Sequence, residues 1–318
     1  MAASITLAIC TYNNSVLLDT VMATIERQAV HCEAKWSVLV VDNNSKDKTK
    51  NVVDRYINQR RIASLRYVFE PKQGLTHARQ RAVLESDSEW IAFVDDDCEL
   101  TSNWILEALQ FVADHPKAGA VGGRVHLKWE VPPADWTLKY QHSLAHQDHG
   151  ELPVRMPDKG FTWLVGAGLL LRREAVEVSG WLQEGRLVDR SGDKTGSGGD
   201  TEIVLRIRHA GYELWYNPAM KLNHFIPWRR MSLEHLCLVH RGVGRSMPFL
   251  LTLGENLEPT VRRRMYLLNS SLRGCARVLG RSARGLLLRQ GVSPEEWINL
   301  YQALGRFEGS FLFLCNGY

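Results

Sequence analysis

The first 125 residues alternate short apolar runs with amphipathic segments, and this alternation constrains the fold more than any other feature of the chain. The apolar runs are rich in β-branched and aromatic residues, whereas the segments between them repeat apolar residues at helical spacing. The predicted strands are residues 5–10, 36–41, 65–69, 90–94 and 118–125, and the predicted helices are residues 16–28, 49–57, 76–84 and 104–113. Because such alternation forms right-handed βαβ crossovers, a mainly parallel sheet flanked by helices is predicted.

The composition is that of an ordinary globular protein. Of 318 residues, 45% are hydrophobic and 23% are charged, so a buried core is expected and wholesale disorder is not. The formal net charge of +4 suits a phosphorylated ligand, an anionic membrane surface or nucleic acid equally well. The six cysteines are scattered and include no C-x-x-C pair, which favours reduced thiols over a zinc knuckle or a disulfide framework.

The apolar segments of the chain are short. Residues 5–10 lack a preceding basic region and are too few for a signal sequence, and residues 249–253 and 311–314 are too few to span a membrane. We therefore expect a cytoplasmic protein.

The middle of the chain has a weaker pattern. Residues 128–159 are rich in Pro, Trp and His, and residues 161–172 are predicted to form a strand pair. Residues 183–199 are Gly-rich and polar, and we interpret them as a lid loop.

The last third is predicted to be helical. A helix at 203–209 and a short strand at 213–216 come first, and from Met231 onward the pattern predicts helices only. Ser293 and Pro294 form a helix start, with an N-cap serine and proline at the first helical position.

Polar side chains follow three of the predicted strands. Ligands of parallel α/β sheets collect beyond the carboxyl ends of the strands, where loops and helix N-termini present free backbone N–H groups. The clusters at these places are Thr11-Tyr12-Asn13, Asp42-Asn43-Asn44-Ser45 and Asp95-Asp96-Asp97. The sequence therefore predicts a ligand site at this edge of the sheet.

Asp95, Asp96 and Asp97 directly follow a buried strand, where repulsion and desolvation make three neighbouring carboxylates costly. A divalent cation offsets that cost, and Mg²⁺ and Mn²⁺ bind through one or two carboxylates plus substrate phosphates. A solvated acidic turn is the alternative, but the position after an apolar strand favours a metal site.

Two more segments carry polar groups toward the same edge. Asp42 ends a strand, and the short polar residues after it either cap the next helix or hydrogen-bond a ligand base. Capping explains Ser45 and Asp47 well and Asp42 less well. Gly74 permits a tight turn before a helix, and Arg79 on that helix can reach a diphosphate, although a solvated arginine is an equally good interpretation.

Five motifs occur in a fixed order: Thr11-Tyr12-Asn13, Val41-Asp42-Asn43-Asn44-Ser45, Gly74-x-x-x-Ala78-Arg79, Asp95-Asp96-Asp97 and Gly199-Asp200-Thr201-Glu202. In this order and spacing they resemble family 2 glycosyltransferases of the A-type fold, over residues 4–228, and the combination is more specific than any single motif. The resemblance implies a Rossmann-like sheet flanked by helices in a catalytic domain at 1–230. That domain would have a nucleotide-binding half (1–127) and an acceptor half (128–230), followed by a C-terminal helical region (231–318).

The resemblance also implies roles for single residues. The implied nucleotide-binding residues are Thr11, Tyr12, Asn13, Asp42, Asn44, Gly74, Arg79, Asp95 and Asp96. Among them, Asp42 would accept a hydrogen bond from the uracil ring and Arg79 would approach the diphosphate. Asp97 would be the direct metal ligand and His224 a further one, although a lone histidine is more often structural. Asp200 would be the general base.

The implied activity is an inverting, metal-dependent sugar transfer from a nucleotide diphosphate sugar, in particular a UDP-sugar, to an acceptor hydroxyl, with Mn²⁺ or Mg²⁺ as cofactor. The acceptor would be a saccharide or lipid-linked saccharide in bacterial cell-surface or exported polysaccharide synthesis. Two departures from the family pattern leave the choice of donor and acceptor open. Gln80 stands where Asn often follows the arginine, and Gly199 stands where an acid often precedes the catalytic Asp.

Three features of the second half have two interpretations each. The small residues 166–168 resemble a family segment near the acceptor, and close strand packing also explains them. Trp163 and Trp181 are either platforms for sugar rings or core residues. His142, His146 and His149 are spaced to share one helical face, which suits zinc or an acceptor-binding helix.

The C-terminal region is basic. Arginines interrupt Leu-rich predicted helices at Arg262, Arg263, Arg264, Arg273, Arg277, Arg281, Arg284 and Arg289. Such a pattern can hold an anionic lipid surface, which would place the protein peripherally at the inner face of the plasma membrane. A solvated helix face is the alternative.

Three other functional classes are less compatible with the motifs. A non-catalytic sugar-nucleotide or polysaccharide-binding module would need neither Asp97 nor Asp200. A nucleotidylyltransferase would carry a Gly-rich, basic loop after the first strand, whereas residues 11–15 are Thr-Tyr-Asn-Asn-Ser. Nucleic acid is not an expected partner, because the arginines lie in one late segment without a recognised motif.

Overall fold

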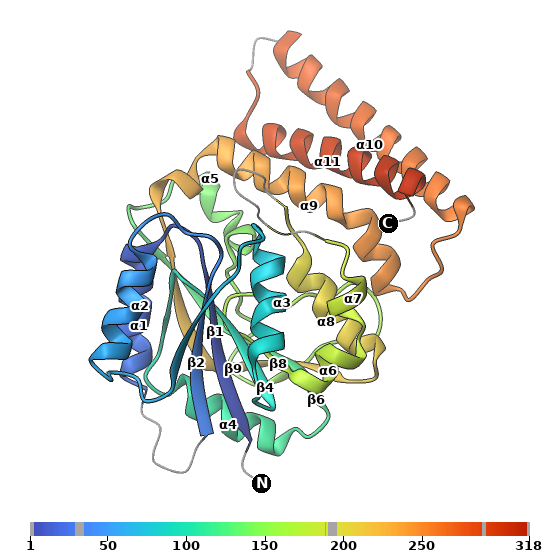
Figure 1. Cartoon of the computed structure of the whole chain (residues 1–318). Helices are drawn as coiled ribbons and strands as arrows, with labels where there is room; N and C mark the ends of the chain where they lie inside the picture. The colour runs from blue at the N-terminus through green and yellow to red at the C-terminus, as the bar shows by residue number, and fades with distance from the viewer. Residues whose placement is uncertain (1–2, 29–34, 188, 190–195, 288–290, 317–318) are drawn as a thin grey trace.

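Residues 3–28, 35–187, 189, 196–287 and 291–316 are described by the computed structural model (Figure 1). They build one mixed sheet with helices on both faces, followed by three long C-terminal helices. The strand order is β3-β2-β1-β4-β8-β6-β9-β5, with β7 paired to β9.

Four parallel strands form the first half of the sheet. They are β3 (Leu65–Phe69), β2 (Lys35–Asp42), β1 (Ser4–Thr11) and β4 (Trp90–Asp95). All four predicted strands are confirmed. The register places Thr11 beside Asp42 and Cys10 beside Asp95, so the polar clusters that follow these strands meet at one edge.

The second half of the sheet contains both parallel and antiparallel strand pairs. The predicted parallel arrangement therefore holds throughout only in the first half. Its strands are β8 (Leu169–Arg172), β6 (Ala118–Trp129), β9 (Glu213–Ile226), β5 (Cys98–Leu100) and β7 (Val154–Arg155). The β8 strand is antiparallel to β4 and β6, whereas β6 and β9 are parallel.

Two strand predictions in this half are confirmed only in part. Only 169–172 of the predicted pair at 161–172 is a strand, because the glycine-containing segment before it is irregular. The short strand at 213–216 continues to Ile226, and its register against β6 shifts between Asn217 and Lys221. Pro218 has no backbone N–H for the β-ladder, so it interrupts the pairing within one long strand. A proline inside a strand also makes the full length of the strand hard to predict from the sequence.

Helices cover both faces of the sheet (Figure 1). One face packs against α1 (Ser15–Glu26), α2 (Thr49–Asn58) and α4 (Trp104–Asp114), and the other against α3 (Leu75–Glu85), α6 (Arg173–Val178), α7 (Trp181–Glu184) and α8 (Gly199–His209). Along β1 the alternation is direct: Leu7 and Ile9 face the first set of helices and Ala8 faces the second. All four helices predicted in the first half are confirmed.

The predicted lid at 183–199 is only partly described. Gln183 and Glu184 belong to α7 and Gly199 begins α8, so those positions are helical and not loop. Residue 188 and residues 190–195 lie outside the described residues.

Short helices pack beside the C-terminal region. They are α5 (Asp135–Leu138), η1 (Gln141–Leu144) and η2 (Trp228–Met231). The region itself consists of α9 (Leu233–Gly254), α10 (Val261–Leu287) and α11 (Pro294–Asn316), as predicted. Ser293 and Glu296 cap α11 reciprocally, each accepting a hydrogen bond from the backbone N–H of the other.

α9 and α11 pack closely because glycines line their interface. A Cβ at Gly244 would lie 2.2 Å from the Gln302 carbonyl oxygen, and one at Gly305 would lie 2.0 Å from the Arg241 carbonyl oxygen. Since larger side chains do not fit at these positions, the two helices hold each other in a fixed arrangement.

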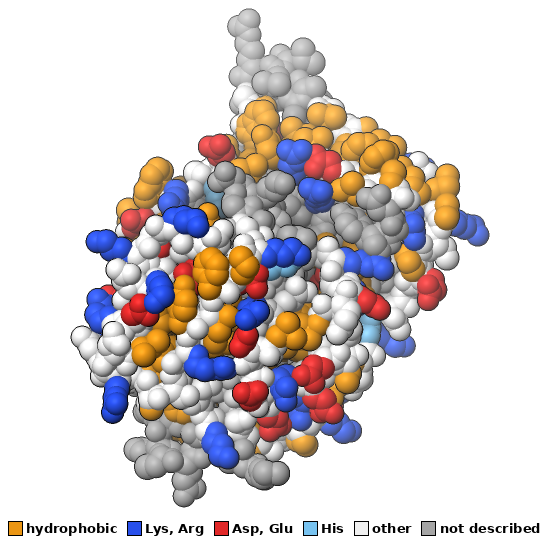
Figure 2. Space-filling model, in the orientation of Figure 1, with side chains coloured by type: hydrophobic (Ala, Val, Ile, Leu, Met, Phe, Trp, Pro, Cys, Tyr) orange, Lys and Arg blue, Asp and Glu red, His pale blue; other side chains and the backbone are white. Residues whose placement is uncertain are grey.

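α10 carries exposed apolar side chains beside its arginines, and Figure 2 shows hydrophobic and basic side chains gathered over this part of the molecule. Val261, Met265, Leu272 and Leu279 are all at least 46% exposed. Among the described residues, none of the helices combines the length and the hydropathy that a membrane span requires.

Candidate active site

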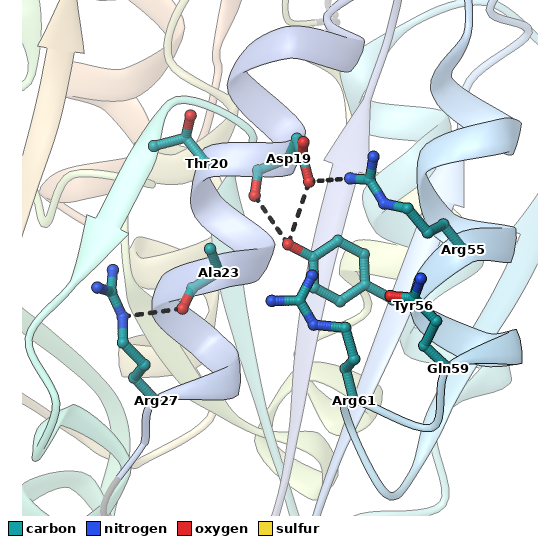
Figure 3. Close-up of a pocket in the computed structure, with 8 residues that line it drawn as sticks. All are labelled: Asp19, Thr20, Ala23, Arg27, Arg55, Tyr56, Gln59 and Arg61. Carbon is teal, nitrogen blue, oxygen red and sulfur yellow. Dashed lines mark hydrogen bonds and ion pairs between the residues drawn. The ribbon is translucent and has the colours of Figure 1, made fainter.

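A cavity of about 640 Å³ lies between α1 and α2 (Figure 3). Its cations are largely neutralised, since Arg55 pairs with Asp19 and Arg61 pairs with Glu26. The Tyr56 hydroxyl also donates to Asp19. None of the predicted site residues lines this cavity, so it is not the candidate site.

A second cavity, of about 730 Å³, lies at the carboxyl ends of the parallel strands. Its lining includes eight of the predicted site residues: Thr11, Tyr12, Arg79, Asp95, Asp96, Asp97, Asp200 and His224. The other four, Asn13, Asp42, Asn44 and Gly74, are not among the lining residues. The fold therefore brings together groups that lie more than 200 positions apart in the sequence.

Asn13 and Asp42 join the loops that follow β1 and β2. The Asn13 carboxamide oxygen accepts from the Lys46 N–H at 2.7 Å, and the Asn13 N–H donates to the Ser45 hydroxyl. The Asp42 carboxylate accepts from the Ser45 N–H and from the Tyr67 hydroxyl, and burial together with Asp42 raises the pKa of Tyr67. These hydrogen bonds hold the two loops together next to the cavity, although Asn13 and Asp42 do not line it.

Asn43, which lines the cavity, also holds the turn before α3. Its buried carboxamide accepts from the Gly74 N–H at 2.7 Å and donates to the Lys72 carbonyl at 2.7 Å. Gly74 has φ +136°, which favours glycine, and it directly precedes α3. Asn43 thus fixes the turn that starts the helix carrying Arg79.

Arg79 is 4% exposed and stands among carboxylates. Its guanidinium lies 3.5 Å from Asp95 and 3.5 Å from Asp189, above the Phe93 ring. Burial lowers the pKa of Arg79, but Asp95, Asp200 and Asp189 outweigh burial and hold the pKa above its ordinary value. A permanent cation is therefore held at the centre of the cavity. Asp189 was not predicted, because it lies in an aperiodic segment.

Asp96 turns back toward β1. It accepts from the Thr11 hydroxyl at 2.6 Å and from the Asn14 carboxamide at 2.7 Å. Burial, followed by the neighbouring Asp97, raises the pKa of Asp96 to about 7, although the hydrogen bonds of Thr11 and Asn14 oppose the shift. The hydrogen bond between Thr11 and Asp96 therefore links the ends of β1 and β4.

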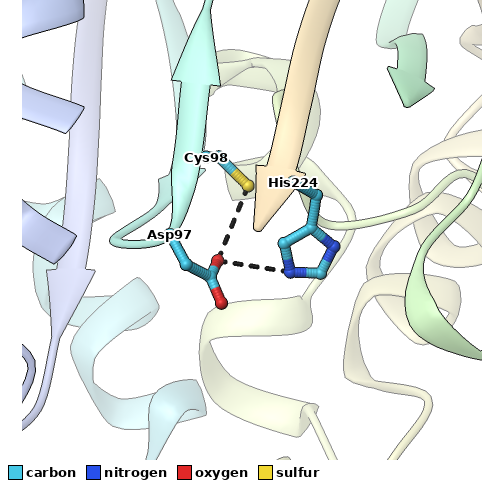
Figure 4. Close-up of side chains that lie close together, drawn as sticks. All are labelled: Asp97, Cys98 and His224. Atoms are coloured by element: carbon cyan, nitrogen blue, oxygen red, sulfur yellow. Dashed lines mark hydrogen bonds and ion pairs between the residues drawn. The ribbon is translucent and has the colours of Figure 1, made fainter. Parts of the chain in front are cut away.

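Asp97 and His224 meet at the wall formed by β9 (Figure 4). The Asp97 Oδ1 and His224 Nε2 atoms are 3.2 Å apart, and the His224 Nδ1 lies 3.0 Å from the Leu144 carbonyl oxygen. With Nδ1–H donating to that carbonyl, the lone pair of Nε2 faces the carboxylate. In this tautomer the two acceptors are stabilised by a cation beside them, and an imidazole held by a backbone carbonyl is a typical metal ligand.

The side chains that offer ligand atoms for a cation here are Asp97, Cys98 and His224. Burial, followed by Asp97, raises the pKa of the Cys98 thiol, so the carboxylate and the imidazole are the stronger ligands of the three. In the structure Arg230 supplies the positive charge, with Nη1 at 3.1 Å from Asp97 and 3.2 Å from His224. Arg230 was not predicted, because one arginine before a helix carries no motif of its own.

Asp200 lies in the first turn of α8, on the cavity wall beside Arg79. Its Oδ2 accepts from the Gly166 N–H at 2.7 Å. A Cβ at Gly166 would lie 2.5 Å from Arg79 Nη2 and 2.7 Å from Asp200 Oδ2, so the absent side chain lets the segment approach both groups. Gln147 holds this segment through the neighbouring Val165 N–H.

One prediction in the second half is wrong. The 3₁₀ helix η1 ends at Leu144, and Ala145 has φ +70°, so His142, His146 and His149 do not share a helical face. Of the two interpretations of Trp181, the core residue is confirmed, since its side chain is 2% exposed and packs against α6 and α8. Trp163, by contrast, lines the cavity and is 42% exposed.

The five described cysteines, Cys10, Cys98, Cys237, Cys275 and Cys315, form no disulfide, in agreement with the prediction of reduced thiols. Cys32 lies outside the described residues.

The family model described as glycosyl transferase family 2 matches residues 6–180. Among curated proteins, the succinoglycan biosynthesis protein ExoM of Rhizobium meliloti (strain 1021) is 26% identical over 235 residues, which cover 73% of this chain and 70% of that protein. The relative's name places that protein in polysaccharide biosynthesis.

Two solved structures have the same fold. The mannosyltransferase PcManGT of Pyrobaculum calidifontis, in complex with GDP-Man and Mn²⁺, has a TM-score of 0.55 at 18% identity and covers 98% of this chain and 87% of its own. TarS residues 1–349 of S. aureus, in complex with UDP-GlcNAc, have a TM-score of 0.56 at 12% identity and cover 97% and 91%. At these identities the likeness establishes the A-type glycosyltransferase fold.

Proposed function

The chain belongs to glycosyl transferase family 2, and on this premise we propose that it transfers a sugar from a UDP-sugar to a saccharide hydroxyl with inversion at the anomeric carbon. The observation that carries the proposal is the arrangement of one cavity. Asp97 and His224 stand on one wall, Asp200 stands on another, and the buried Arg79 lies among the acidic groups.

Asp97 and His224 are the proposed ligands of Mn²⁺ or Mg²⁺. When bound, the metal would neutralise charge that develops on the departing diphosphate. Arg79 would add a fixed positive charge, which costs no reorganisation because Asp95 and Asp189 already hold the guanidinium in place. Tyr12, which lines the cavity and is 43% exposed, is the proposed contact for the base or ribose, with Thr11 beside it.

Asp200 is the proposed general base. The Gly166 N–H fixes one of its oxygens, which leaves the other to accept the proton of the attacking hydroxyl. A base and a leaving group on opposite faces of the sugar favour a single displacement. A non-catalytic binding module would need neither the close pair of Asp97 and His224 nor the close approach of Gly166 to Arg79 and Asp200.

Two further proposals concern the biosynthetic role of the protein and its location in the cell. The relative named for succinoglycan biosynthesis supports a role in cell-surface or exported polysaccharide synthesis. The exposed apolar row of α10, next to Arg262, Arg273 and Arg277, supports peripheral contact with the inner face of the plasma membrane. Sedimentation with vesicles containing anionic lipid, compared with neutral vesicles, tests this contact.

The decisive experiment measures UDP release from a panel of UDP-sugars with Mn²⁺ or Mg²⁺, with and without saccharide acceptors. We expect metal-dependent release by the wild type that both Asp97→Ala and Asp200→Asn abolish. Release from no donor, together with nucleotide binding that Asp97→Ala leaves undiminished, would instead favour a binding module.

A further inference from the structure

The cavity extends beyond the charged groups into a region built by the C-terminal helices. This acceptor end is formed by Trp163, His142, Ser143 and Gln302, together with the α9 residues Val239, His240, Val243, Ser246, Met247 and Leu250. Of the described α9 and α11 residues that line the cavity, none carries an ionic side chain. The C-terminal region therefore contributes a wall to the site.

Trp163 offers an apolar face inside the cavity. It is 42% exposed and stacks obliquely on Phe161, with ring centroids 5.7 Å apart. The segment before it is fixed by Arg208, which donates to the Gly160 and Gly254 carbonyls at 2.9 and 2.7 Å. Trp163 thus follows a segment that Arg208 holds against the end of α9.

His240 lines the same cavity as Trp163. The imidazole is 6% exposed, and its Nε2 lies 3.0 Å from the Ser143 hydroxyl. The Gln302 side chain also acts on the ring as a hydrogen-bond partner. His240, Ser143 and Gln302 therefore form a group of neutral donors and acceptors in the cavity wall, which the hydroxyls of a bound sugar could join.

The histidines at this end are neutral at physiological pH. Burial, followed by His142, lowers the pKa of His240 to about 4, although Gln302 opposes the shift. Burial likewise lowers the pKa of His142. Neutral imidazoles, a hydroxyl and a carboxamide both donate and accept, which matches the hydroxyl groups of a sugar better than a carboxylate or a phosphate.

Resting on the function proposed above, we infer that the acceptor end is a built subsite for an uncharged sugar residue of the acceptor, stacked on Trp163 and hydrogen-bonded by His240 and Gln302. The sugar's apolar ring face would cover the indole, and its hydroxyls would meet the polar groups opposite. The rigid packing of α9 on α11 through Gly244 keeps Gln302 at the wall.

The test uses the full chain with UDP and Mg²⁺, and saturation-transfer NMR with neutral disaccharides (lactose, cellobiose, maltose and chitobiose) and a glucuronate-terminated disaccharide. We expect at least one neutral disaccharide to bind, and its dissociation constant to rise about tenfold in Trp163→Ala. Trp297→Ala is the matched control, because Trp297 is 40% exposed on α11 and does not line the cavity. It should bind like the wild type.

His240 is tested by two substitutions in the same assay. His240→Phe should weaken saccharide binding, and His240→Gln, which keeps a donor and an acceptor, should restore part of it. Unchanged UDP affinity and an unchanged unfolding midpoint show that each variant is folded.

Three results would overturn the inference: no disaccharide bound by a chain that binds UDP, binding that is indifferent to Trp163→Ala and His240→Phe, or preference for the glucuronate. A chain that does not bind UDP would instead contradict the proposed function.

Discussion

The two ends of the cavity differ in charge and in origin. The donor end (Arg79, Asp95, Asp97, Asp200 and His224) is ionic, and Arg79, Asp95 and Asp97 come from α3 and the end of β4. The acceptor end is uncharged along its helical wall and comes mainly from α9, η1 and α11. The difference teaches that the proposed reacting groups sit on the sheet and on the helices packed against it, whereas the helical wall of the acceptor end comes from α9 and α11, which follow the last strand.

Asp200→Asn is expected to have the largest effect and to separate the two ends most sharply. Loss of the base should lower kcat about 10²- to 10⁴-fold, while metal-dependent UDP affinity and saccharide affinity stay unchanged. Initial-rate kinetics and calorimetric titration measure the two effects. Asp114→Asn, at an exposed carboxylate in the last turn of α4, is the control. A fall in UDP affinity equal to the fall in kcat would assign Asp200 to binding and contradict its role as the base.

The donor end could be predicted from the sequence because its groups lie in short motifs after strands with strong periodicity. The parallel strands and the places of Arg79, Asp97 and Asp200 follow from local pattern and family resemblance. Asp189, Gln147 and Arg230 were missed because each acts through contacts with residues far away in the chain, which no spacing reveals.

The acceptor end was predicted poorly for the same reason. Trp163 and Trp181 look equivalent in the sequence, yet the first lines the cavity and the second is buried in the core. Their difference depends on how 157–163 docks on α9, which is a tertiary contact held by Arg208. The division at residue 230 between a catalytic domain and a helical region remains a prediction, although α9 and α11 line the catalytic cavity.

The second prediction concerns pH and the uncharged acceptor end. His240 stays neutral in the folded state down to a pKa of about 4, whereas an unfolded histidine takes up a proton near 6.5. Stability is therefore complete above pH 6.5 and is lost as the pH falls toward 4, because the unfolded chain binds the extra proton. At about 1.4 kcal/mol per pKa unit, the upper limit of this loss is about 3 kcal/mol.

Urea unfolding at pH 7 and pH 4.5 measures the effect in the wild type and in His240→Gln. The variant should lose less stability on acidification than the wild type, while His126→Gln, at an exposed histidine of β6, should behave like the wild type. His142 faces the same ring, so His142→Gln should reduce the acid sensitivity in part. Equal acid sensitivity in His240→Gln and the wild type would mean that His240 is not a buried neutral group.

The third prediction concerns Gly166, which lies against Arg79 and Asp200 at the donor end. Gly166→Ala should lower kcat about 10- to 100-fold, because the new methyl group would collide with Arg79 and Asp200 and displace both reacting groups. Gly274→Ala on α10 is the control, since a Cβ there meets nothing within 4 Å. Full activity in Gly166→Ala would show that the donor end tolerates movement and that its geometry is not set by this segment.

The smallest effect is expected for a substitution of Arg230, whose guanidinium supplies positive charge to the donor end. Arg230 Nη1 lies 3.1 Å from Asp97 Oδ2 and 3.2 Å from His224 Nε2, so a metal held by these two side chains would compete with the Arg230 charge. Arg230→Gln should therefore tighten Mn²⁺ binding in the absence of nucleotide by about threefold to tenfold, as measured by electron paramagnetic resonance of free Mn²⁺. Arg229→Gln, which alters a neighbouring lining residue of η2, is the matched control. Weaker Mn²⁺ binding in Arg230→Gln would mean that Arg230 orients Asp97 and His224 instead of competing with the metal. The donor end would then be preorganised for its ligand, as the acceptor end is proposed to be.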